Sequence, residues 1–154
     1  MKATTTARPV AASEDLGLEA WKAFLFAHSR LVRELDAELQ EAHGVGIGDF
    51  DVLVNLATAP RRRLRMCDLA NQVLLSPSGI SRRVERLERE GLVQRERASG
   101  DARSVEAGLT PAGTRLLRQL RRTHREGIRN RFVDHFNARE LETLRGLLGR
   151  LAVD

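Results

Sequence analysis

The chain has 154 residues, enough for one packed domain, and its 42% hydrophobic and 31% charged residues are typical of a soluble globular protein. No apolar run approaches the roughly 20 residues of a membrane span, and the N-terminus lacks the apolar core of a signal peptide. We therefore expect a cytoplasmic protein without a membrane partner. Its single cysteine, Cys67, excludes an intramolecular disulfide and a cysteine-based zinc site.

The net charge of +5 is concentrated in one part of the chain. Residues 60–103 hold 11 arginines and 6 acidic residues, and the basic and acidic residues of all other segments cancel. A local basic excess is typical of a surface that meets phosphate groups. Codon bias towards arginine and a solvated basic loop at residues 61–63 are the alternative explanation, so charge alone favours a nucleic-acid partner only slightly.

The first half of the chain predicts helices. Residues 1–13 are expected to form a flexible tail, and residues 14–154 a single domain. Apolar residues at steps of three and four predict a long helix over about residues 16–42. A second apolar helix follows from Phe50 to Ala57, and Pro60 ends it.

A third helix is predicted over about residues 66–73. Ser76 and Pro77 then supply a capping oxygen and a first-turn proline for a fourth helix, which ends at Gly91. After this glycine the period changes, because "LVQRER" and "SVEAGL" alternate as strands do and "ASGDAR" between them predicts a hairpin.

Two more helices complete the chain. Thr110 and Pro111 repeat the cap-and-proline signal and open a long helix through "AGTRLLRQLRRTHREGIRNRFVDHF". Asn137 and Glu140 have the spacing of a capping box, and leucines recur along the last helix. The predicted fold class is mainly α (α+β): a winged helix-turn-helix with a two-stranded wing and a helical dimerisation region.

The fourth helix has two distinct faces. Ile80, Val84 and Leu87 share one stripe and are expected in the core, whereas Arg82 faces away from them. Arginine pairs well with guanine in the major groove, so we predict that Arg82 contacts a base. An ordinary amphipathic surface helix is an almost equally good explanation of this helix alone.

The segments "LANQVLLSPSGISRRVERLEREGLVQRE" and "DARSVEAGLTPAG" resemble the MarR family of bacterial transcription regulators, the second through its D-x-R…L-T-x-x-G wing signature. The resemblance covers about residues 16–152. It implies that Arg103 at the wing tip reaches the minor groove while Asp101 holds the tip in shape. A turn with a local ion pair is the weaker alternative. The predicted DNA-binding residues are Ser76, Ser78, Gly79, Ser81, Arg82, Arg86, Arg97, Asp101 and Arg103.

The resemblance also implies a homodimer that binds an inverted repeat in double-stranded DNA. The winged helix-turn-helix would span about residues 48–110, and the dimerisation helices about residues 16–42 and 111–152. Independently, the leucines of the last helix and the apolar face that carries Trp21 exceed what one small winged helix needs to cover. Packing within one chain is the alternative explanation.

Regulators of this family commonly respond to a ligand, and a small anionic or aromatic molecule is the most plausible one here. Asp51, Arg83 and Arg95 resemble ligand-pocket positions of the urate-responsive branch. An internal ion pair between Asp51 and one of these arginines explains the three residues equally well. The four histidines lack metal-ligand spacing, so we expect no metal, no cofactor and no redox sensing through Cys67.

The sequence contains none of the motifs that indicate catalysis. It lacks a serine, histidine and aspartate grouping, a glycine-rich phosphate loop after a strand, and an HExxH metal site, so we expect no enzyme. The predicted function is that of a sequence-specific, ligand-responsive repressor. A winged-helix module for protein contacts, or a DNA-binding protein without sequence preference, is the alternative.

Overall fold

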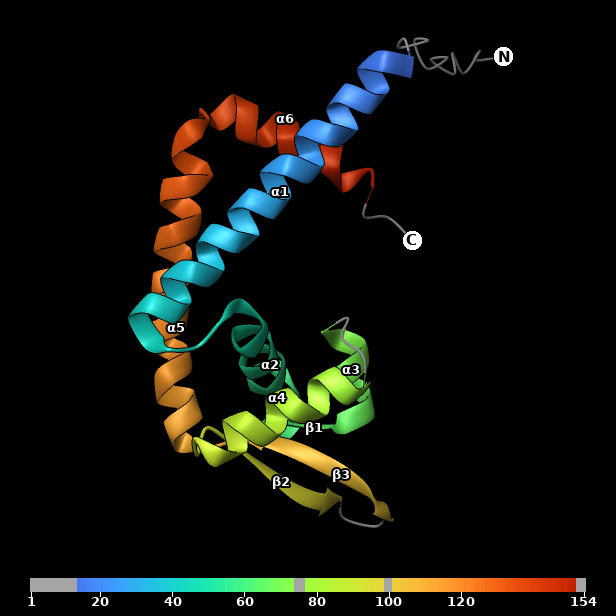
Figure 1. Ribbon diagram of the computed structural model, residues 1–154, viewed down its shortest axis with the longest axis vertical. Coiled ribbons are helices and arrows are strands. Elements are labelled where there is room, and N and C mark those ends of the chain that lie inside the picture. The colour runs from blue at the N-terminus through green and yellow to red at the C-terminus, as the bar shows by residue number, and fades with distance from the viewer. Residues whose placement is uncertain (1–13, 74–76, 99–100, 152–154) are drawn as a thin grey trace, which may run out of the picture.

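The computed structural model describes residues 14–73, 77–98 and 101–151, which fold into six α-helices and a small antiparallel sheet (Figure 1). The tail predicted over residues 1–13, and Ser76, lie outside the described residues. In chain order the elements are α1 (Glu14–His43), α2 (Ile47–Thr58), η1 (Pro60–Arg62), β1 (Arg63–Arg65), α3 (Met66–Gln72), α4 (Pro77–Arg89), β2 (Val93–Ala98), β3 (Asp101–Leu109), α5 (Pro111–Arg131), η2 (Val133–His135) and α6 (Ala138–Gly149).

Local capping chemistry sets the starts of the last two helices, as predicted. The Thr110 hydroxyl accepts a hydrogen bond from the backbone N–H of Gly113 at 3.0 Å, at the start of α5. At α6 the Asn137 side chain accepts from the Glu140 N–H, and the Glu140 carboxylate accepts from the Asn137 N–H at 2.8 Å. These two reciprocal bonds form the capping box that the sequence indicates.

The sheet has three strands rather than the two of the predicted wing. Its order is β1-β3-β2, and all pairs are antiparallel. The basic segment after Pro60, predicted as a loop, extends at Arg63–Arg65 and pairs with β3 opposite Glu106 to Gly108. β2 and β3 form the predicted hairpin, which closes between Ala98 and Asp101.

Two helix boundaries differ from the prediction. α2 begins at Ile47 instead of Phe50, with Gly46 as its N-cap, and the Asp49 carboxylate accepts a hydrogen bond from the Gly46 N–H as the third residue of a capping box does. α5 ends at Arg131 rather than near residue 136, because Phe132 leaves helical geometry at φ −128° and η2 follows.

One apolar core holds together the lobe formed by α2, α3, α4 and the sheet, and it also includes the inner faces of α1 and α5 (Figure 1). The predicted stripe of α4 is confirmed, since Ile80, Val84 and Leu87 are at most 1% exposed. The other fully buried apolar side chains of this core include Leu39, Val52, Leu53, Leu56, Leu69, Val93 and Leu120.

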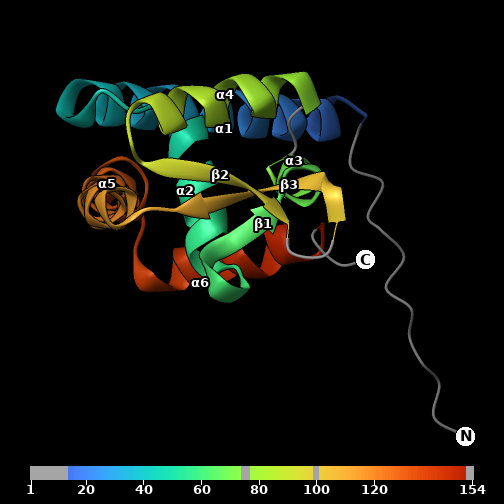
Figure 2. The ribbon, with the colours of Figure 1, turned by 90° about the horizontal axis from the view of Figure 1, so that it is seen from below.

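The opposite end of the molecule is built from α1, α5 and α6. In Figure 1 α1 and α6 cross, but the perpendicular view in Figure 2 shows that they lie on opposite sides of the molecule. Both helices expose large apolar side chains there, among them Trp21 (55%) and Leu147 (48%). Within the described segments, no helix is long and apolar enough to cross a membrane.

Candidate nucleic-acid interface

α4 carries the central part of the candidate interface. Its inner stripe anchors it to the core, and Arg82 and Arg89 are exposed on the outside with Ser81 half-buried beside them. The position of Ser78 within α4 is described, but its side chain lies outside the described atoms, and so do the side chains of Asp101 and Arg103 in β3. The DNA contacts assigned to these residues therefore stay predictions.

Ion pairs tie the wing to α4. The Arg95 guanidinium in β2 donates to Glu88 of α4 at 2.7 Å, and the Glu88 carboxylate also accepts from the Arg95 backbone N–H at 3.1 Å. Glu85 of the same helix lies 3.5 Å from Arg95. The hydrogen bond from Arg95 lowers the pKa of Glu88, so both groups stay charged at neutral pH. The wing is thereby fixed in orientation to the helix beside it.

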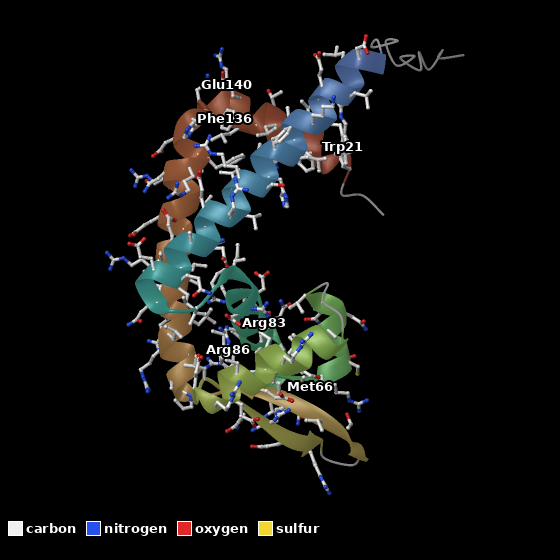
Figure 3. All side chains as sticks on the ribbon, viewed as in Figure 1. Trp21, Met66, Arg83, Arg86, Phe136 and Glu140 are labelled. Atoms are coloured by element: carbon white, nitrogen blue, oxygen red, sulfur yellow. The ribbon has the colours of Figure 1, made fainter. Side chains whose placement is uncertain are left out.

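A second ion-pair cluster ties α4 to the first turn of α2. The Asp49 side chain is 1% exposed and accepts hydrogen bonds from Arg83 at 2.9 Å and from Arg86. Figure 3 labels both arginines, which lie between α4 and α2. Sequence reasoning missed Asp49, although its spacing three residues after Gly46 is that of a capping residue at the start of a helix.

Asp51, unlike Asp49, faces α5. The His124 ring of that helix packs against the Phe50 ring in a tilted arrangement, with ring centroids 4.7 Å apart, and it interacts electrostatically with Asp51. The Asp51 side chain reaches solvent, but its partial burial raises its pKa, and the positive charge of Arg83 opposes this rise. The sequence allowed an internal ion pair of Asp51 with Arg83 or Arg95, but Arg83 pairs with Asp49 and Arg95 with Glu88, and Arg83 acts on Asp51 only as a nearby charge.

The three predicted ligand residues do not meet in one site. Arg83 lines a cleft of about 650 Å³ between α1, α2 and α4, together with Asp36, Gln40 and Arg82. Arg95 lines a different hollow of about 520 Å³, which Arg65, Cys67 and Ser104 also border. Asp51 is in neither lining. In the part of the chain that the structure describes, no group of three or more His, Cys, Asp or Glu side chains could hold a metal ion.

A helix-turn-helix whose second helix lies beside an antiparallel hairpin defines a winged-helix protein. The model of the MarR family matches residues 43–104. The HTH-type transcriptional regulator PecS of Dickeya dadantii (strain 3937) is 32% identical over 108 residues, 67% of this chain and 62% of PecS, so the match leaves more than a third of that relative uncovered.

Two crystal structures from Streptomyces coelicolor resemble this one along most of their length. AbsC, a MarR family transcriptional regulator, is 31% identical with a TM-score of 0.79, covering 94% of this chain and 95% of its own. Sco3205, a MarR family regulator in complex with DNA, is 32% identical with a TM-score of 0.81, covering 95% and 91%. The chain belongs to the MarR family, whose members are transcriptional regulators and not enzymes.

Proposed function

We propose that this protein is a transcriptional regulator that binds a pseudo-palindromic site in double-stranded DNA as a homodimer. The observation that carries the proposal is α4, which buries an aliphatic stripe, exposes Arg82 on its outer side and lies beside a wing that exposes Arg97. A helix of this kind fits the major groove, which is wide enough to admit it. Sco3205, bound to DNA in its crystal structure, has the same fold and supports this reading.

The helix and the wing have different tasks in this proposal. Arg82 reads a base edge in the major groove, where each base pair presents a distinct pattern of donors and acceptors. Arg103 enters the minor groove from the wing, Arg97 contacts phosphates, and Asp101 holds the wing tip. Phosphate or base contacts are assigned to Ser76, Ser78, Gly79 and Ser81 around the start of α4.

The exposed apolar side chains of α1 and α6 support the homodimer. On α1 they include Phe24 (41%) and Phe26 (76%), and near the C-terminus Leu151 (78%). Figure 3 labels Trp21 and Phe136, which lie at the end of the molecule away from the wing. A second copy that packs against both helices would remove these surfaces from water. The two α4 helices of a dimer would then meet half-sites about one DNA turn apart.

Electrophoretic shift assays over a salt series test the proposal. Genomic fragments selected by the protein should give a site with inverted symmetry, and binding to it should weaken steeply as salt rises because bound arginines release counterions. Equal affinity for selected and random duplex would favour a DNA-binding protein without sequence preference. Absence of binding to any duplex would favour a protein-interaction module.

Repression relieved by a small anionic or aromatic ligand is the finer part of the proposal. The cleft lined by Arg83 supports it, since an anion there would act on the helix that reads DNA. Such a ligand weakens DNA binding only if it binds the two dimer conformations unequally. Titrating a panel of benzoate derivatives against the operator complex tests this. If no derivative shifts the operator affinity, this class of ligand is excluded.

A further inference from the structure

Asp49 is the one charged side chain among the fully buried residues of the described chain, with 0% of the residue exposed. Its carboxylate accepts three hydrogen bonds, from the Gly46 N–H at 3.2 Å, from Arg83 at 2.9 Å and from Arg86. The first bond lies within the start of α2, and the other two come from α4. One carboxylate therefore joins the first turn of α2 to two successive turns of α4.

The backbone before Asp49 is shaped to admit the arginines. A Cβ atom at Gly48 would lie 2.8 Å from Cζ of Arg83 and 2.9 Å from both of its terminal nitrogens. The guanidinium group thus lies directly against the Gly48 backbone. A side chain at position 48 would have to displace this guanidinium, so Gly48 leaves room for Arg83 to reach Asp49.

The cluster also fixes where two positive charges of α4 are directed. Arg83 and Arg86 are one turn apart, and their side chains are 32% and 38% exposed. The hydrogen bond to Asp49 raises the pKa of Arg86, so this guanidinium is firmly held in its charged form. Both groups therefore lie against α2, whereas Arg82, the residue before Arg83, is exposed.

We propose that Asp49 is a positioning residue for DNA binding, which seats α4 against α2 and keeps the guanidinium groups of Arg83 and Arg86 from contacting DNA phosphates. This inference rests on the proposed function and adds to it. Of the four arginines of α4, it assigns Arg82 to reading DNA and Arg83 and Arg86 to orienting the helix. It also replaces the DNA contact predicted for Arg86 by a contact within the protein.

Asp49→Asn tests the inference, because it removes the charge and keeps the shape. Operator affinity should fall roughly tenfold to a hundredfold, the loss expected when a bidentate base contact is misplaced. Affinity for random duplex should hold or rise. The slope of log affinity against log salt should steepen by about one for each released guanidinium that neutralises a phosphate, and so by about two when Arg83 and Arg86 are both released.

A second substitution identifies the released group. In the Asp49→Asn background, Arg86→Gln should bring the salt slope back by about one, the share that the released Arg86 adds. A role of Asp49 in stability alone would not produce this reversal. Asp68→Asn is the matched control, since it removes the same charge from an exposed position of α3 and should leave the salt slope within about 0.3 of the starting value.

The outcomes separate this inference from the proposed function. If the unaltered protein binds no site specifically, the proposed function fails and the inference with it. If it binds specifically and Asp49→Asn binds with the same affinity and slope, only the inference is overturned. Should Asp49→Asn not fold, Arg86→Gln alone decides: the slope stays the same if Arg86 is held by Asp49, and falls by about one if Arg86 contacts a phosphate.

Discussion

Two aspartates on α2, two residues apart, should respond in opposite ways to the same substitution. Asp49 is fully buried between two arginines, whereas Asp51 reaches solvent beside His124. Changing either to asparagine removes one negative charge and almost no volume. The difference in stability between the two variants therefore reflects the different surroundings of the two carboxylates.

The expected magnitudes follow from the contacts. Removing one partner of a buried ion pair costs about 3–5 kcal/mol. The low end applies to Asp49, because Arg83 and Arg86 are each about one-third exposed and can turn to water. A loss of about 3 kcal/mol lowers the melting temperature by roughly 6–12 °C in a protein of this size.

The Asp51 variant should show no such loss. Burial raises the pKa of Asp51, so the folded state disfavours its charged form at neutral pH. Asparagine removes this cost, and the gain is below about 1 kcal/mol because the group reaches solvent. The melting temperature should therefore stay the same or rise slightly.

Thermal unfolding followed by circular dichroism at equal protein concentrations measures both variants, since the melting temperature of a dimer depends on concentration. A fall for Asp51→Asn as large as that for Asp49→Asn would show that Asp51 makes the stabilising ion pair after all. A change of less than about 2 °C for Asp49→Asn would refute the assignment of the α2–α4 tie to Asp49.

Three further predictions concern DNA contacts, pH and assembly. Arg82→Ala should cost roughly 1–3 kcal/mol of binding free energy on the operator and much less on random duplex. Arg103→Ala should weaken binding to DNA with only an A·T-related change in preference. Shift assays with operator and random duplex would refute this division if both variants lost the same affinity on both DNAs. Burial lowers the pKa of His124 below 6.5, so the unfolded chain takes up a proton at this histidine more readily than the folded chain does. The free energy of unfolding is therefore unaffected by this group above pH 6.5 and decreases as the pH falls below it. His124→Gln should therefore make the melting temperature depend less on pH in this range. If the melting temperatures of the variant and the unaltered protein fall in parallel, His124 is not the group responsible. Trp21→Glu should shift the sedimentation coefficient from dimer to monomer at micromolar concentration, while Glu19→Gln on an exposed part of the same helix should not.

Features fixed by local chemistry were predictable from the sequence. The caps at Thr110 and Asn137 were confirmed because a capping bond involves residues only two or three positions apart. The buried stripe of α4 was confirmed because helical periodicity alone decides which residues share a face. β1 was missed since three residues are too few to show alternation, and its pairing partner lies more than 40 residues further along the chain.

The candidate site depended on contacts that periodicity does not determine. Positions 49 and 51 are two residues apart and so lie about 200° apart around a helix. One of these faces meets α4 and the other meets α5, and which is which follows only from how α2 is rotated in the core. The sequence offered Asp51 as the ion-pair partner of Arg83 or Arg95 and missed Asp49, because only the tertiary structure shows which aspartate faces α4.

The formal charge of the DNA-binding lobe overstates what it offers to phosphates. Of the 11 arginines in residues 60–103, at least four are engaged with acids in the part of the protein that the structure describes: Arg63 with Glu96, Arg83 and Arg86 with Asp49, and Arg95 with Glu88. A guanidinium already neutralised by a carboxylate releases few counterions when DNA binds. The slope of operator affinity against salt should therefore reflect only the arginines that are not paired with these acids. The slope should steepen when one of the pairing carboxylates is removed. In this lobe the placement of the acidic residues, as much as that of the basic ones, determines which side chains read the DNA.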